Sequence, residues 1–215
     1  MRLRKDARAE KYLEEENKVI KNPQTIKGKW NIEFNNENEI FVEFGCGKGD
    51  FALEMVKAYP NINFIAIEKF ETVLYKACKK ANAENGIPQN LRFLNIDVES
   101  CIDIFGSHEL SRIYLNFSDP WPKNKYAKRR LTYRKFLDKY KSILKPSGEI
   151  HFKTDNKQLF AFSIEEFSYS KWLIKNVSLD LHNSNFKNNI ITEYERKFSE
   201  LGYTINRLEA IPPSN

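Results

Sequence analysis

A stiff aromatic segment that carries a carboxylate is the first feature of this sequence able to do chemistry. Ser118–Lys123 reads SDPWPK and follows the apolar run Ile113–Phe117. Its two prolines fix φ, and the tryptophan between them offers a flat surface for a base or a cofactor ring. Asp119 therefore belongs to a rigid loop suited to positioning a planar group.

A glycine-rich turn is the second such feature. Glu43–Asp50 reads EFGCGKGD, between an apolar run and a helical pattern. Glycines let backbone approach a ligand closely, and a helix N-terminus adds unpaired N–H groups. A dinucleotide fingerprint is excluded because Asp50 stands where glycine or alanine is required. A phosphate-binding P-loop is excluded because Lys48 precedes Gly49 instead of serine or threonine.

Three carboxylates follow successive apolar runs. Glu43 lies in the first turn, Glu68 follows the second run and Asp97 follows the third. The carboxyl ends of parallel strands share one edge of a sheet, where open α/β sheets bind ligands. Glu68 is placed to accept hydrogen bonds from two ribose hydroxyls, although each acid alone is also compatible with a helix N-cap.

The pattern E-x-G-x-G-x-G resembles motif I of the class I methyltransferases. The resemblance implies S-adenosylmethionine as cofactor, with Glu43 near its charged methionine end and Asp97 facing the adenine amino group. The implied cofactor-binding residues are Glu43, Gly45, Gly47, Gly49, Glu68, Asp97 and Asp119.

Further segments carry a closer resemblance, to the bacterial tRNA (guanine-N7)-methyltransferases, over nearly the whole chain. They are Asn22-Pro23, Gly28–Trp30, Asn116–Lys123, Arg129–Leu131, Phe152–Asn156 and Thr192–Glu195. The one visible departure is Cys46, where the family often has threonine.

That resemblance implies methylation of guanosine 46 in the tRNA variable loop, which forms 7-methylguanosine. It implies that Asp119 is catalytic and that Lys123 and Asp155 contact the substrate. It also implies that the guanosine pocket is shaped by the TEYE segment, which consists of Thr192, Glu193, Tyr194 and Glu195.

The chemistry agrees with this assignment. Guanine N7 carries an in-plane lone pair and no proton, so the reaction needs in-line positioning instead of a general base. Methylation leaves a positive charge on the purine, which a carboxylate such as Asp119 can stabilise.

A basic cluster directly after the SDPWPK segment is suited to hold the phosphates beside the target nucleotide. Its members are Lys123, Lys125, Lys128, Arg129, Arg130 and Arg134. A second cationic group at Arg2, Arg4, Lys5 and Arg8 is predicted to become ordered on RNA. The target guanine should lie in an irregular or single-stranded region, since the A-form major groove is deep and narrow.

The composition is that of a soluble globular protein with an anionic partner. The 215 residues are 41% hydrophobic and 30% charged, with a formal net charge of +6. No apolar run suits a signal peptide or a membrane span, so we expect a cytoplasmic protein. Three scattered cysteines and three histidines without ligand spacing predict neither disulfides nor a metal site.

Alternating apolar runs and amphipathic stretches predict the elements that position these residues. The expected strands, in chain order, are Ile40–Phe44, Asn63–Ile67, Leu91–Asn95, Arg112–Phe117, Glu149–Lys153, Trp172–Leu179 and Tyr203–Leu208. The expected helices are Ala7–Ile20, Asp50–Tyr59, Glu71–Asn85, Thr132–Leu144, Asn156–Ser170 and Ile191–Leu201.

We therefore predict an α/β class I methyltransferase fold, with a Rossmann-like, mostly parallel sheet of seven strands, the last antiparallel, and helices on both faces. Residues 1–38 form a basic N-terminal arm, and residues 39–215 form the methyltransferase domain. The partner is tRNA, without a membrane or a metal, and the protein is a monomer or a homodimer.

Other functions stay open on sequence alone. The proline-rich segment also fits an exocyclic amino-group methyltransferase, and the substrate could be another structured RNA. A non-catalytic RNA-binding protein with a vestigial cofactor pocket is a third interpretation, against which Glu43, Glu68, Asp97 and Asp119 argue.

Overall fold

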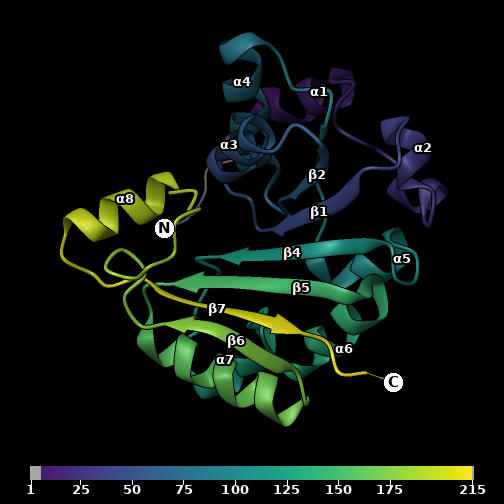
Figure 1. Ribbon diagram of the computed structural model, residues 1–215. Helices are drawn as coiled ribbons and strands as arrows, with labels where there is room; N and C mark the ends of the chain where they lie inside the picture. Colours follow the sequence, from purple (N-terminus) through teal and green to yellow (C-terminus); the bar gives the residue numbers. More distant parts are fainter. Residues whose placement is uncertain (1–5, 215) are drawn as a thin grey trace. The chain divides into compact units, whose positions relative to one another are not determined.

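The computed structural model describes residues 6–214, which form two compact units. Unit 1 ends at Gly106 and unit 2 begins at Ser107. Each unit has its own strands and its own helices (Figure 1).

Unit 1 consists of a three-stranded parallel group of strands with its helices. The strands are β1 (Glu39–Phe44), β2 (Ile62–Ile67) and β3 (Leu91–Leu94), in the spatial order β3-β2-β1. The helical elements are α1 (Ala7–Glu15), η1 (Pro23–Ile26), α2 (Trp30–Phe34), α3 (Asp50–Ala58), α4 (Glu71–Asn85), η2 (Val98–Ser100) and α5 (Cys101–Ile104).

The core of unit 1 follows from the apolar runs. Every residue of β2 is buried, as expected for the middle strand of a parallel group covered on both faces. The Phe51 ring of α3 lies edge-on to Phe64 of β2, with 6.2 Å between ring centroids. These contacts hold the start of α3 close to the strands from which the candidate ligands project.

The described part of the predicted arm packs on unit 1. Helix α1 lies against α4, and a short parallel bridge joins Val19 to Phe93 of β3. Trp30 is fully buried, and its indole Nε1 donates to the carbonyl of Ile104 at 2.9 Å. Arg8 pairs with Asp6 on the surface, whereas Arg2, Arg4 and Lys5 lie outside the described residues.

Unit 2 consists of four strands with helices that follow or precede them. The strands are β4 (Leu110–Asn116), β5 (Leu144–Thr154), β6 (Leu173–Ser178) and β7 (Asn206–Ile211), in the order β4-β5-β7-β6. The helical elements are η3 (Asn124–Arg129), α6 (Arg134–Ile143), α7 (Lys157–Tyr169) and α8 (Glu193–Glu200).

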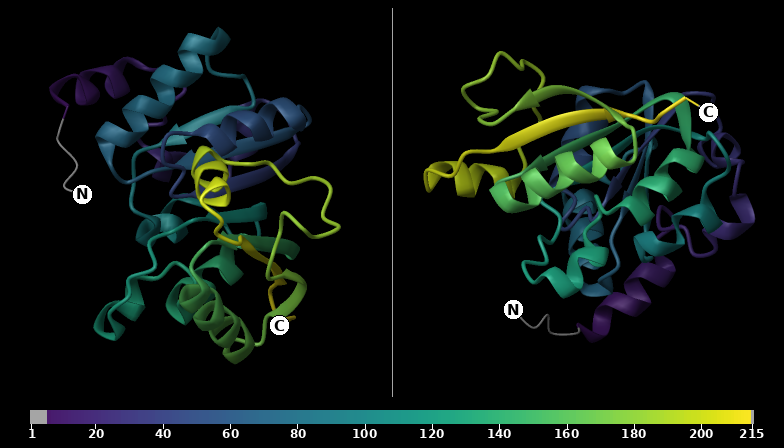
Figure 2. Two further views of the ribbon diagram at one scale, coloured as in Figure 1. Left: turned by 90° about the vertical axis from the view of Figure 1, so that its left-hand side faces the viewer. Right: turned by 90° about the horizontal axis from the view of Figure 1, so that it is seen from below.

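The strand directions in unit 2 agree with the sequence prediction. Strand β4 is parallel to β5, and β7 runs antiparallel to both β5 and β6. Helices α6 and α7 pack against each other and against β5 (Figure 2). Residues 6–214 thus hold the seven expected strands, the last of them antiparallel.

Several elements differ from the prediction, among them one helix end, one strand start and two short helices. The helix expected over Ala7–Ile20 ends at Glu15, because the backbone at residues 18–20 instead pairs with Phe93. The last strand begins at Asn206 instead of Tyr203. Helices α2 and α5 were not predicted, since four or five residues are too few to show a helical period.

The three cysteines, Cys46, Cys78 and Cys101, are free and buried, and all belong to unit 1. In the part of the chain that the structure describes, no helix is long and apolar enough to cross a membrane.

Candidate active site

The glycine-rich turn of unit 1 is tied to the neighbouring strand. The N–H groups of Gly45 and Cys46 both donate to the Ile67 carbonyl at the end of β2, at 2.8 and 2.9 Å. Gly45 and Gly47 have φ values of 82° and 57°, in the region that favours glycine. A Cβ at either position would meet no atom within 4 Å, so both leave open space that a ligand can enter.

Gly49 has a different function in the same turn. It precedes α3 with φ at 79°, and a Cβ there would lie 3.0 Å from the Cβ of Ala77 on α4. The missing side chain therefore allows the turn to pack closely on α4.

Gly49→Ala is expected to lower the free energy of unfolding by about 1–3 kcal/mol, from a left-handed backbone together with crowding. Gly202→Ala is the matched control, because Gly202 has φ at 84° and no atom within 4 Å of its Cβ position. Denaturant titration of both variants separates the cost of the left-handed backbone from the cost of crowding against Ala77. Equal losses would show that the contact with Ala77 contributes nothing.

Two of the predicted acids are buried at the ends of neighbouring strands. Glu43 on β1 is 2% exposed. Glu68 follows β2 and accepts hydrogen bonds from the N–H groups of Phe70 at 2.9 Å and Gly47 at 3.2 Å. Burial raises the pKa of Glu68. A carboxylate accepts about four hydrogen bonds, so Glu68 can fix the glycine turn and still bind hydroxyl groups.

The third acid, Asp97, is exposed after β3. It caps η2 by accepting a hydrogen bond from the Glu99 N–H at 3.0 Å, so it serves as a helix cap in this structure. Nearby Asn95 donates from Nδ2 to the Glu68 carbonyl at 2.8 Å and joins the ends of β2 and β3. Asn95 was missed in the sequence because a single asparagine carries no spacing signal.

These residues fit S-adenosylmethionine. The turn has two open glycine positions, and acceptor carboxylates lie at or after the ends of β1, β2 and β3, which are neighbours in unit 1. The cofactor offers an ammonium group, a sulfonium charge, two ribose hydroxyls and an adenine amino group, all of which favour acceptors or negative charge.

In unit 2, the SDPWPK segment leaves β4 through a distorted backbone. Phe117 and Trp121 have φ values of 51° and 41°, which is uncommon for aromatic residues. The Phe117 N–H donates to the Lys153 carbonyl at 2.9 Å, which fixes the start of the loop. Asp119 and Lys123 are exposed.

The basic cluster divides into outward and inward members. Lys123, Lys125, Lys128 and Arg129 are exposed. Arg130 is 9% exposed and bonds to the SDPWPK backbone, and Arg134 forms an ion pair with Glu166 of α7 at 2.8 Å. Four of the six cations are therefore exposed, whereas Arg130 is buried and Arg134, with 39% of its side chain exposed, is paired with Glu166.

The TEYE segment opens α8 and is partly structural. Thr192 is the N-cap and accepts a hydrogen bond from the Glu195 N–H at 2.9 Å. Glu195 is 0% exposed and forms an ion pair with Lys153 of β5 at 2.7 Å. The Glu195 carboxylate also accepts hydrogen bonds from Asn189 and His182. Lys153 had no predicted role, because one lysine in a strand gives no signal of burial.

Tyr194 is the exposed aromatic residue of the TEYE segment. It is 41% exposed, its ring stacks on Phe198 at 4.1 Å between centroids, and Phe117 lies 4.9 Å away. Its hydroxyl donates to Asp155 at 3.4 Å. Burial and the Asp155 charge raise the pKa of Tyr194 to about 12, so the phenol stays neutral at pH 7.

Asp155 directly precedes the N-cap of α7 and does not cap the helix itself. The cap is Asn156, whose side-chain oxygen accepts a hydrogen bond from the Leu159 N–H at 2.8 Å. Asp155 instead accepts the hydrogen bond from the Tyr194 hydroxyl. Glu193, which precedes Tyr194 in the sequence, is exposed.

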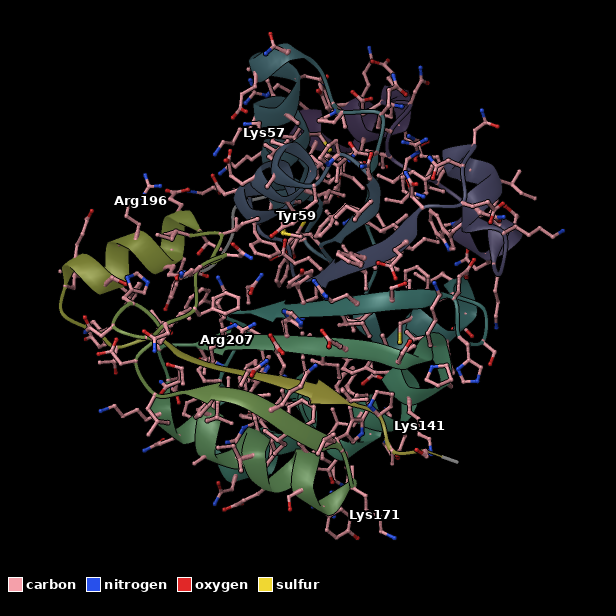
Figure 3. All side chains as sticks on the ribbon, in the orientation of Figure 1. Lys57, Tyr59, Lys141, Lys171, Arg196 and Arg207 are labelled. Carbon is pink, nitrogen blue, oxygen red and sulfur yellow. The ribbon has the colours of Figure 1, made fainter. Side chains whose placement is uncertain are left out.

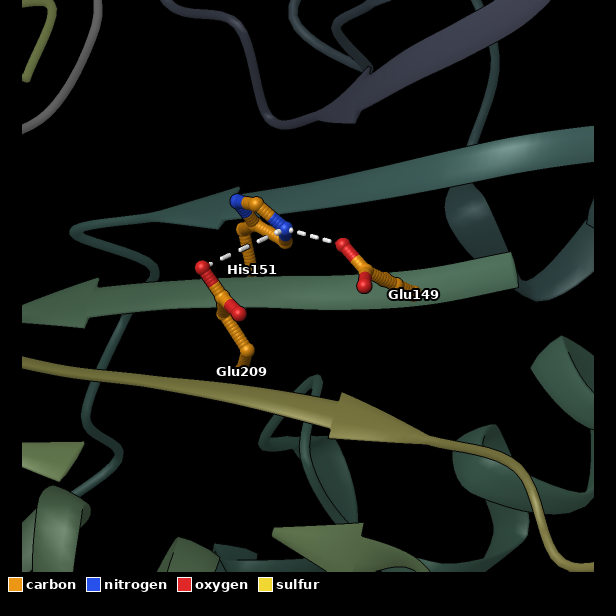
Figure 4. Close-up of side chains that lie close together, drawn as sticks. All are labelled: Glu149, His151 and Glu209. Atoms are coloured by element: carbon orange, nitrogen blue, oxygen red, sulfur yellow. Dashed lines mark hydrogen bonds and ion pairs between the residues drawn. The ribbon is translucent and has the colours of Figure 1, made fainter. Parts of the chain in front are cut away.

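Glu149, His151 and Glu209 form a cluster on β5 and β7 that the sequence did not reveal (Figure 4). His151 lies 2.8 Å from Glu149, and this hydrogen bond lowers the pKa of Glu149 to about 2. Both carboxylates already have cationic partners, Lys175 at 2.6 Å from Glu149 and Arg207 beside Glu209. We therefore assign no metal to the cluster.

Comparison with solved structures identifies the fold as that of the class I S-adenosylmethionine-dependent methyltransferases. The 16S rRNA methyltransferase KamB matches with a TM-score of 0.62 at 11% identity, over 87% of this chain and 95% of its own. A 16S rRNA adenine-N1 methyltransferase from Catenulisporales acidiphilia, solved with its cosubstrate S-adenosylmethionine, matches at 0.58 and 13% identity, over 86% and 91% of the two chains.

Sequence comparison gives the particular family. A family model described as "Putative methyltransferase" matches residues 37–208. The tRNA (guanine-N(7)-)-methyltransferase of Clostridioides difficile (strain 630) is 51% identical over 97% of both chains, and that of Bacillus subtilis (strain 168) is 49% identical over 97% of this chain and 98% of its own. The chain belongs to the tRNA (guanine-N7)-methyltransferase family.

Proposed function

We propose that this protein transfers a methyl group from S-adenosylmethionine to N7 of a guanine in tRNA, at guanosine 46 of the variable loop, in the cytoplasm. The observation that carries the proposal is about 50% identity, over 97% of the chain, to proteins named for that reaction. The sequence motifs and the open glycine turn support it independently.

We propose that unit 1 binds the cofactor. Gly45 and Gly47 give it backbone access, Gly49 packs the turn, Glu43 faces its cationic end, Glu68 accepts from the ribose and Asp97 accepts from the adenine amino group. The burial of Glu43 supports its part in this, because a carboxylate in a low-dielectric site attracts a cation more strongly than it does in water. When bound, the cofactor supplies an electrophilic methyl group.

Asp119 of unit 2 is proposed as the catalytic residue and as a further cofactor contact. Since N7 has no proton to lose, this carboxylate has no base chemistry to perform; it orients the purine and stabilises the positive charge that develops on it. Lys123, Asp155, Thr192, Glu193, Tyr194 and Glu195 complete the proposed substrate site. Within this set, Tyr194 is an exposed aromatic side chain, and buried Glu195 holds the start of α8.

The exposed cations Lys123, Lys125, Lys128 and Arg129 are proposed to bind RNA phosphates. We also keep the proposal that residues 1–38 are an RNA-binding arm on a methyltransferase domain of residues 39–215. The family match over residues 37–208 supports that boundary.

The test is incubation of the purified protein with methyl-labelled S-adenosylmethionine and unmodified tRNA, followed by nucleoside analysis. We expect labelled 7-methylguanosine, and its loss when guanosine 46 is replaced. Recovery of only an N6- or N2-methylated base would instead support the exocyclic amino-group alternative. Calorimetry with the cofactor alone would identify a protein that binds RNA without catalysis.

A further inference from the structure

Two neighbouring arginines after the SDPWPK segment have different surroundings. Arg129 is exposed, and its guanidinium lies 4.9 Å from the ring centroid of Trp121 and 5.0 Å from that of Tyr126. Arg130 is 9% exposed. Because one arginine is exposed and the other is buried, we do not expect the two side chains to contribute equally to RNA binding.

The Arg130 side chain bonds to the backbone of the SDPWPK segment. Its Nε donates to the Pro120 carbonyl at 3.0 Å, and its Nη2 donates to the Trp121 carbonyl at 3.0 Å. The planar guanidinium presents donors in a fixed fork, so one side chain fixes two consecutive peptide groups. These groups directly follow Asp119 in the chain.

The backbone at this point needs such support. Trp121 has φ at 41°, a left-handed conformation that bulky residues rarely adopt. Backbone carbonyls outside regular secondary structure also need donors from side chains or water. Arg130 supplies both donors at the strained residue and its neighbour.

Helix α7 anchors the residue that gives this support. The Arg130 guanidinium carbon lies 4.3 Å from the ring centroid of Phe162. Two residues further on, the Thr132 hydroxyl lies 2.7 Å from that of Ser163, and Arg134 then pairs with Glu166. Alternate residues of the segment thus contact one side of α7, and they connect the SDPWPK loop to a regular element.

We propose that Arg130 is a positioning residue for methyl transfer, which holds the loop that carries Asp119 through the Pro120 and Trp121 carbonyls and does not bind phosphate. Arg129, which is exposed and lies over the half-buried rings of Trp121 and Tyr126, is the RNA-binding member of the pair. The expected effect on kcat rests on the proposed function. The inference replaces the sequence prediction that both arginines contact RNA.

The test compares three single-charge deletions, Arg130→Ala, Arg129→Ala and Lys141→Ala. Lys141, labelled in Figure 3, lies on α6 away from the SDPWPK segment in sequence and controls for net charge. The tRNA dissociation constant is measured at several salt concentrations between about 50 and about 300 mM, a range over which screening of phosphate contacts increases. The kcat is measured at saturating tRNA.

For Arg130→Ala we expect kcat to fall about 10- to 100-fold, as for a displaced catalytic group, with an unchanged salt slope of tRNA binding. For Arg129→Ala we expect the slope of log K against log salt to fall by about 1, the loss of one phosphate contact. The proposal is overturned if Arg130→Ala lowers the slope as Arg129→Ala does and keeps kcat within about twofold of Lys141→Ala.

Arg130→Lys keeps the charge without the planar fork and guards against loss of folding. It should retain wild-type tRNA affinity but recover only part of kcat, because one ammonium does not reproduce the fork. Full recovery of kcat by lysine would contradict a role for the two-carbonyl contact.

Amide hydrogen exchange over residues 118–123 tests the loop contact without assuming any reaction. Exchange should be faster in Arg130→Ala than in Arg129→Ala at the same global stability. Unchanged exchange would overturn the proposal. Absence of 7-methylguanosine from the wild-type reaction would overturn the proposed function alone.

Discussion

Asp119→Ala is expected to lower kcat by about 100- to 1,000-fold, which is the usual cost of removing one group that stabilises transition-state charge. The residue is exposed on a loop whose backbone is held elsewhere, so the fold should not depend on its carboxylate. Single-turnover methylation at saturating tRNA and cofactor measures the effect.

Two controls give this result its meaning. Asp138→Ala removes an exposed carboxylate from α6 and should leave kcat close to the wild-type value. Asp119→Asn keeps the size and a hydrogen-bonding oxygen but removes the charge, so it should recover little activity if charge stabilisation dominates. Near-normal turnover of Asp119→Ala would remove this residue from the mechanism.

Lys153→Met is expected to lower the free energy of unfolding by about 3–5 kcal/mol, because it leaves a buried carboxylate without its cation. Glu195 is 0% exposed, and the Lys153 ammonium also donates to the Ile190 carbonyl at 2.9 Å. Urea denaturation of the variant at pH 7 gives the loss. Lys153→Met combined with Glu195→Met should be more stable than the single variant, since the unpaired charge is then absent.

The pH dependence provides a second check on this pair. Burial alone would raise the pKa of Glu195, but the charge and hydrogen bond of Lys153, with Asn189 and His182, lower it below its usual value. In the wild type, the stability that this pair contributes is therefore present above the unfolded pKa and is lost as the pH falls. In Lys153→Met burial dominates and raises the pKa, so the variant should gain stability relative to the wild type as the pH is lowered from 7. A constant difference would contradict this account.

The sequence predicted the regular elements and the edge of the strands where the acids gather. Helix α4 has the predicted bounds Glu71–Asn85, because a long amphipathic stretch ends at Gly86, where φ is 84°. Strands β1 and β2 were each one residue longer at their start than expected. Long periodic segments carry this information locally, which is why they could be predicted.

The sequence could not predict contacts that depend on distant partners. Arg129 and Arg130 are identical neighbours in the sequence. Only tertiary contacts distinguish them, because Arg130 packs on Phe162 and bonds to the Pro120 and Trp121 carbonyls. Lys153 and Glu195 lie in different motifs, and their pairing depends on how α8 returns to β5. The Glu149–His151–Glu209 cluster was missed for the same reason, since Glu209 comes from the antiparallel strand β7.

Because all three cysteines lie in unit 1, thiol labelling can measure the local opening of that unit separately from unit 2. Burial raises the pKa of Cys46 and raises that of Cys78 to about 12, so neither thiol reacts readily while its surroundings are closed. Because no cysteine occurs after Cys101, a thiol-labelling rate measured under native conditions reports the opening of unit 1 and is blind to unit 2. Slower labelling on addition of S-adenosylmethionine would then measure how much cofactor binding stabilises the glycine turn and its neighbours, in an experiment that needs no RNA.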